Sequence, residues 1–133
     1  MARSLIQTVN QSPQDVAAGG IITLGSTQRR FGCNLRLSGN GIEANGAGYY
    51  TADAIVTAEP TAAGIVTVAL YDNGAQVPGA IASVTAGTAG DSVVLPIIAT
   101  VRVGCCDPAH NLTVVLEDGA GAVENISVRV VKE

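Results

Sequence analysis

The chain has 133 residues, of which 47% are hydrophobic but only 3% aromatic, and its formal net charge at pH 7 is −4. This length fits one domain, since domains typically contain ~100–150 residues. Seven basic against eleven acidic residues leave no basic surface for nucleic acid, and no run of ~20 apolar residues could insert in a membrane. Aromatic side chains bury the most area, so this core is thin and we expect an oligomer to bury more.

The first residues, 1–18, are polar and read as an extended arm or as a first strand. Met1 to Gln14 contain no continuous apolar segment of the kind found in secretory signals. We therefore expect a protein made in the cytoplasm that either stays inside the cell or leaves by lysis.

Apolar residues recur with a period of two through most of the chain, which is typical of half-buried strands. In Cys33–Ser38, the side chains of Cys33, Leu35 and Leu37 should share a face. The same alternation occurs in Gly64–Asp72, Asn111–Asp118 and Glu124–Lys132. Asp91–Val103 and parts of the other segments are apolar on both faces, which predicts contacts beyond one core. Pro96 lacks an N–H and predicts an edge, a bulge or a strand break.

Turn signals separate these segments at intervals of roughly 8–12 residues, as in sandwiches and barrels. Asn73-Gly74 is the sharpest of them, because both residues tolerate the positive φ of a tight hairpin between Asp72 and Ala75. The pattern predicts an all-β fold of roughly eight to ten short antiparallel strands in a single domain spanning residues 1–133.

Catalytic and metal-binding patterns are weak. His110 is the single histidine, no G-x-S-x-G segment is present, and we interpret His110 as a solvated loop residue. Cys33, Cys105, Cys106 and His110 could supply zinc ligands, but adjacent cysteines lack the usual C-x₂₋₄-C spacing. A disulfide from Cys33 to one of the pair is an alternative, and a buried, inert Cys33 is the interpretation we favour. We predict no enzyme activity, no catalytic or metal residues and no cofactor.

Four segments carry a family resemblance. They resemble successive strands of the tumour-necrosis-factor-like and complement-globular-head jelly rolls. The segments are, in chain order, Gly48-Tyr49-Tyr50, Val66 to Gly74, Gly90 to Leu95 and Ile126 to Val128. The resemblance covers about two-thirds of the chain. It implies a jelly-roll sandwich that forms homotrimers around an axial apolar seam.

A second resemblance, in overall character, is to phage head-fibre and capsid-decoration proteins. It rests on a polar start, Gln7 to Ser12, before a compact Gly- and Ala-rich β domain. We expect a non-enzymatic, homotrimeric structural protein of a virion, with capsid proteins and host-surface glycans as candidate partners. The alternative is a tumour-necrosis-factor-like binding module on a bacterial or spore surface. Ligand-binding residues stay unknown, and the candidate contact loops are Ser38 to Gly48 and Ala86 to Asp91.

Overall fold

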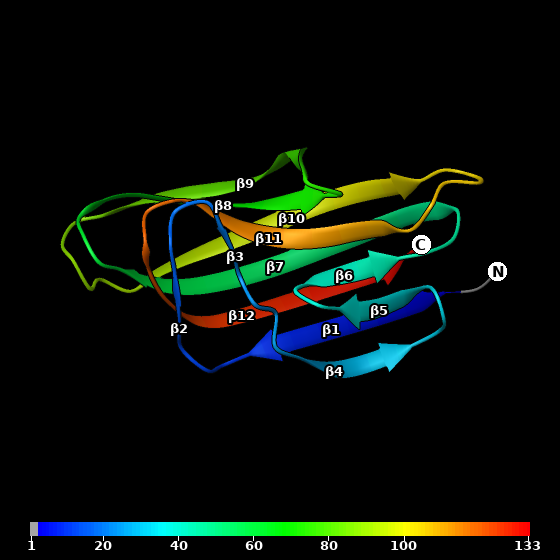
Figure 1. Cartoon of the computed structure of the whole chain (residues 1–133), viewed down its shortest axis with the longest axis horizontal. Coiled ribbons are helices and arrows are strands. Elements are labelled where there is room, and N and C mark those ends of the chain that lie inside the picture. The colour runs from blue at the N-terminus through cyan, green and yellow to red at the C-terminus, as the bar shows by residue number, and fades with distance from the viewer. Residues whose placement is uncertain (1–2) are drawn as a thin grey trace.

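The structure is a computed structural model that describes residues 3–133, and it consists of two antiparallel β-sheets packed face to face (Figure 1). The strands in chain order are β1 (Ser4–Asn10), β2 (Gln14–Val16), β3 (Gly20–Ile21), β4 (Ser26–Phe31), β5 (Leu35–Ser38), β6 (Gly41–Ala44), β7 (Gly48–Pro60), β8 (Gly64–Asp72), β9 (Ala75–Ala86), β10 (Val93–Val103), β11 (His110–Asp118) and β12 (Gly121–Lys132).

Sheet A has the order β10-β7-β12-β1-β4, and β2 pairs with β12 beside it. Sheet B has the order β5-β6-β11-β8-β9, and β3 pairs with β11. The chain changes sheet at every connection except those between β1 and β2, between β5 and β6, and between β8 and β9. These crossovers confirm the all-β fold that the period-two pattern predicts and the jelly-roll sandwich that the family resemblance implies. The strands are more numerous than the expected eight to ten because β2 and β3 contain only three and two residues.

The core lies between the sheets and follows the predicted alternation. Along β10, every second residue from Val93 to Val103 is buried and the residues between them are exposed. Tyr50 on β7 is the largest fully buried side chain. Its hydroxyl donates to the carbonyl oxygens of Asn45 (3.1 Å) and Gly46 (2.8 Å). The ring therefore fills the core while its polar end is satisfied at the edge.

Two local predictions are confirmed. Asn73 and Gly74 have φ values of 51° and 84°, and Asp72 pairs with Ala75, which is the positive-φ hairpin expected of Asn-Gly. Pro96 lies in β10, an edge strand of sheet A that pairs only with β7. A residue without an N–H is tolerated there because the free side of the strand needs no donor.

Two other predictions are wrong. Cys33 is exposed, because β5 begins only at Leu35 and Cys33 belongs to the preceding turn. His110 is the first residue of β11 and half-buried, so it is not a solvated loop residue. Of the segment read as an arm or a first strand, Ser4–Asn10 forms β1. Residues 1 and 2 lie outside the described part.

Residues 3–133 contain no helix that is long and apolar enough to cross a membrane.

Candidate functional site

The outward face of sheet A carries the most exposed large aliphatic side chain of the described chain. Ile98 on β10 is 69% exposed, Val94 on the same strand 58%, and Ile55 on β7 49%. Pro96 lies between Val94 and Ile98 and is also exposed. Because alternate residues of β10 point into the core, these side chains all point away from it. We call Ile55, Val94, Pro96 and Ile98 the apolar strip.

The strand register places the strip beside a charged pair. Ile55 is opposite Pro96, and Ile98 is opposite Asp53. Asp53 is in turn opposite Arg129 of β12, whose guanidinium Nη2 lies 3.0 Å from Asp53 Oδ2. The outward face of sheet A is thus apolar at β10 and β7, with an ion pair next to it.

An exposed apolar row of this kind indicates an interface, because removing contiguous apolar surface from water lowers the free energy. The row lies on strands that also bury their other face in the core, as the two-sided pattern of Asp91–Val103 predicts. A partner with a flat apolar surface could pack against it, and a second copy of this chain offers one.

Sheet B has an apolar row of a different kind on its outer face. Val115 is opposite both Ile21 and Ala69, and Ala69 is opposite Ile81. Ala69 and Val115 are buried within the chain, at 0% and 8% exposure, whereas Ile21 and Ile81 stay exposed. The middle of this second apolar face of β8 and β11 is therefore buried within the chain, while its two ends are exposed.

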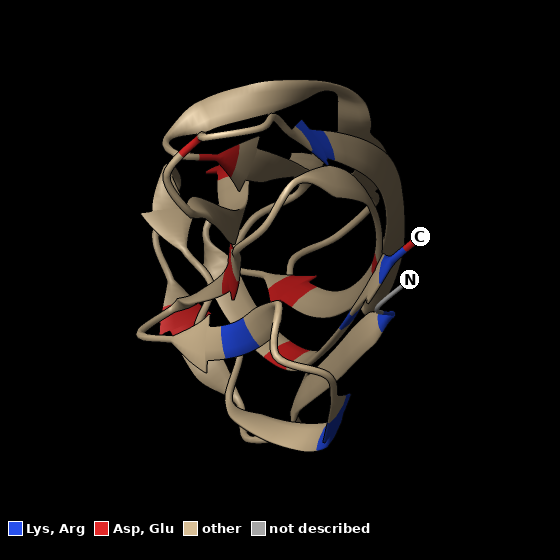
Figure 2. Cartoon of the chain, turned by 90° about the vertical axis from the view of Figure 1, so that its right-hand side faces the viewer, with Lys and Arg blue, Asp and Glu red and all other residues tan. Residues whose placement is uncertain are grey.

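Charge also separates the two outer faces. In the end view of Figure 2, Lys and Arg segments lie mainly on the side of the two termini. Sheet A strands hold five basic residues, Arg29, Arg30, Arg102, Arg129 and Lys132, and four acidic residues, Asp15, Asp53, Glu59 and Glu124. Sheet B strands hold four acidic residues, Glu43, Asp72, Glu117 and Asp118, and one basic residue, Arg36. Packing two sheet B faces together would bring like charges close, which costs energy.

One of these acids has a specific partner. The hydroxyl of Tyr71 on β8 donates a short hydrogen bond to the carboxylate of Glu117 on β11. This hydrogen bond, together with partial burial and the negative charge of Glu117, raises the pKa of Tyr71 above its ordinary value. The pair lies beside the apolar row on the outer face of sheet B.

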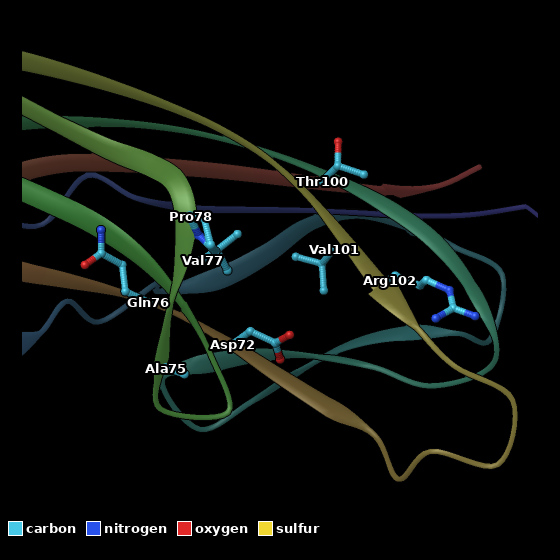
Figure 3. A pocket seen from close by; sticks show the side chains of 8 residues that line it. All are labelled: Asp72, Ala75, Gln76, Val77, Pro78, Thr100, Val101 and Arg102. Atoms are coloured by element: carbon cyan, nitrogen blue, oxygen red, sulfur yellow. The ribbon is translucent and has the colours of Figure 1, made fainter.

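A cleft opens between the start of β9 and the end of β10 (Figure 3). Its volume is about 220 Å³, and Val77, Pro78 and Val101 form its apolar side. Asp72, Gln76, Thr100 and Arg102 supply polar groups. Figure 3 shows the Asp72 side chain projecting away from the hairpin that carries Ala75, and Arg102 pointing toward the outer end of β10. The cleft is shallow and open, so it has polar groups for a ligand but little enclosure.

His110 is held next to this cleft. Its Nδ1 lies 2.9 Å from both carboxylate oxygens of Asp72, and its Nε2 lies 3.7 Å from Asp107 Oδ2. Both ring nitrogens therefore face carboxylates. The hydrogen bond to Asp72 joins the β8–β9 hairpin to the start of β11, whereas the distance from Nε2 to Asp107 is too long for a hydrogen bond.

The structure does not bring together Cys33, Cys105, Cys106 and His110, the four candidate zinc ligands that the sequence offers. Cys33, Cys105 and Cys106 are free thiols, and all three are exposed. Across residues 3–133, no three His, Cys, Asp or Glu side chains form a group that could hold a metal ion. The imidazole of His110 faces Asp72 and Asp107 instead.

The two predicted contact loops differ in structure. Ser38 to Gly48 is not all loop, because Gly41–Ala44 within it forms β6 and pairs with both β5 and β11. Ala86 to Asp91 connects β9 to β10, and its Asp91 side chain accepts a hydrogen bond from the N–H of Thr88. Neither segment belongs to the apolar strip, which sequence reasoning did not single out residue by residue.

Comparison with solved structures identifies the architecture. Murine APRIL superposes with a TM-score of 0.72 at 9% identity, covering 99% of this chain and 100% of that chain. The fold is that of the tumour-necrosis-factor and complement 1q jelly rolls. The globular domain of zebrafish complement 1qA gives a TM-score of 0.64 at 8% identity, covering 96% and 94%.

A structural protein of a virus shares the architecture. The PRD1 vertex protein P5 superposes with a TM-score of 0.56 at 12% identity, covering 98% of this chain and 96% of that chain. No protein-family model matches the sequence, and no curated protein matches it. At such low identities, the likeness to solved structures defines the fold alone.

Proposed function

We propose that this jelly roll is a non-enzymatic structural protein of a virion, a homotrimeric head fibre or capsid-decoration protein. The observation that carries the proposal is the apolar strip, which leaves Ile98, Val94 and Ile55 exposed on one regular sheet. Three copies that share this face around a common axis would cover it, because a closed ring buries the same patch on every subunit. The acidic outer face of sheet B would stay in solvent.

Two kinds of neighbour support this role. The fold is shared with the globular heads of binding proteins such as complement 1qA and with the PRD1 vertex protein P5. Host-surface glycans are candidate ligands for the open cleft beside Arg102.

Size-exclusion chromatography with light scattering tests the assembly. We expect the wild-type chain to elute as a trimer at micromolar concentration and Ile98→Asp to elute as a folded monomer. Three buried carboxylates near an axis would repel one another without partners. The matched control is Ile65→Asp, because Ile65 is 59% exposed but lies on β8 of sheet B. A wild-type monomer, or equal dissociation of both variants, would contradict the assignment of the apolar strip.

The virion role has its own test. Capsid and portal genes beside the coding sequence, together with recovery of the protein in purified particles, would support it. Spore-coat or secretion genes in that position, with no protein in particles, would favour a tumour-necrosis-factor-like binding module on a cell or spore surface. The cleft and the apolar strip are compatible with both roles, so the genomic context decides between them.

A further inference from the structure

The turn between β10 and β11 holds the two adjacent cysteines in an arrangement that strands do not allow. Successive side chains of a strand point to opposite faces, whereas the Sγ atoms of Cys105 and Cys106 lie 3.4 Å apart. Both side chains are exposed. The turn lies at the end of the sandwich that also holds the two termini (Figure 1).

Two hydrogen bonds close the turn, and they hold one of its residues in a strained backbone conformation. The N–H of Asp107 donates to the carbonyl oxygen of Gly104 (3.2 Å), and the Asp107 carboxylate accepts from the N–H of Gly104 (2.8 Å). Cys106 has a φ of 72°, a left-handed conformation that costs a non-glycine residue energy. Residues held in such conformations concentrate at functional sites.

We propose that Cys105 and Cys106 form a dithiol site that peroxides oxidise to a disulfide between the adjacent residues. The thiolate of one cysteine attacks the peroxide O–O bond, which gives a sulfenic acid and, from hydrogen peroxide, one water. The neighbouring thiol then attacks the sulfenic sulfur, forms the S–S bond and releases a second water. Two thiols are oxidised and one peroxide is reduced, so no further reactant is needed.

Cys33 provides the internal comparison, because it is equally exposed but its neighbours in the chain are Gly32 and Asn34. It has no adjacent thiol to complete the second step. A ring of two residues also restricts the unfolded chain very little. We therefore expect disulfide formation to remove two reactive thiols from this end of the molecule and to leave the unfolding temperature almost unchanged.

The experiment treats the full-length protein with hydrogen peroxide, labels the remaining thiols with N-ethylmaleimide and measures intact and peptide masses. We expect the reduced chain, with its three cysteines, to take three labels and the oxidised chain to take one, at Cys33. The peptide containing residues 105 and 106 should lose two hydrogen atoms, and a reductant should restore all labels. Retention of three labels, cross-linked chains on a non-reducing gel, or stable sulfinic acids at both positions would overturn the proposal.

A pair of matched variants tests the contribution of the turn. Asp107→Ala removes the side chain that closes it and should slow disulfide formation by roughly 10-fold to 100-fold, the effect of a lost near-attack geometry. Asp91→Ala is the control. Asp91 closes the turn Thr88–Asp91 with the same two hydrogen bonds but has no cysteine beside it. Equal rates in Asp107→Ala and wild type would refute the role of the turn geometry.

Discussion

Thr8 on β1 is fully buried, and its hydroxyl has no hydrogen-bond partner among residues 3–133. Burying an unpaired hydroxyl costs about 1–3 kcal/mol on protein scales. Thr8→Val keeps the shape of the side chain and removes this cost. We expect the free energy of unfolding to rise by about 1 kcal/mol in urea titrations followed by circular dichroism.

Thr67 on β8 gives the opposite case at nearly equal burial. It is 4% exposed, and its Oγ1 lies 2.8 Å from the hydroxyl of Ser83. Thr67→Val removes this hydrogen bond and should lower the free energy of unfolding by about 0.5–1.5 kcal/mol. A gain in stability for both variants would show that valine is favoured by the strands themselves, and hydrogen bonding would then not explain the Thr8 result.

Among the connections between the first strands, two positions require glycine for different structural reasons. Gly19 and Gly25 both have a φ of 83°. A Cβ at Gly19 would meet no atom within 4 Å, whereas a Cβ at Gly25 would lie 2.3 Å from the carbonyl oxygen of Val9. Gly19→Ala should cost only the left-handed conformation, about 1–2 kcal/mol.

Gly25→Ala should cost the same conformational energy plus about 1–3 kcal/mol for forcing β1 away from the chain that leads into β4. Thermal unfolding of the two variants side by side measures this difference. Equal losses would mean that β1 and the segment around Gly25 can move apart freely.

The alternation of apolar residues predicts the strands well wherever a strand is long and half-buried, as in β10 and β12. It misses β2, β3 and β6 because two to four residues are too few to show a period, and because Gly41 at the start of β6 and the Asn45-Gly46 pair after it read as turns. It also misses β4, whose residues are all exposed, and β9, which is mostly exposed. It extends the strand at Leu35 back to Cys33, whereas Gly32 has a φ of 82° and the chain turns there. The contact between His110 and Asp72 joins residues 38 positions apart, and no local pattern predicts it.

The two outer faces of the whole molecule differ in exposed apolar surface and in charge. Sheet B buries the middle of its own apolar row at Ala69 and Val115 and presents acids, while sheet A leaves its apolar strip uncovered. A chain with only 3% aromatic residues gains much of its missing burial if sheet A is shared between copies. In such an assembly, the ion pair of Asp53 and Arg129 next to the strip would lose much of its solvent.

This change of environment makes the ion pair a test of the interface. Removing one partner of a desolvated pair leaves an uncompensated charge and costs about 3–5 kcal/mol, whereas breaking an exposed pair costs about 0–1 kcal/mol. We therefore expect Asp53→Leu to weaken the trimer by at least about 100-fold, as measured by light scattering over a dilution series. The double variant Asp53→Leu with Arg129→Met should recover wild-type assembly or exceed it, because it replaces the pair by apolar contacts.

The control is an ion pair on the other sheet. Glu43→Leu breaks the ion pair with Arg36 on sheet B and should leave assembly unchanged. If Asp53→Leu assembles as well as Glu43→Leu does, the outward face of sheet A stays in water and the copies associate elsewhere.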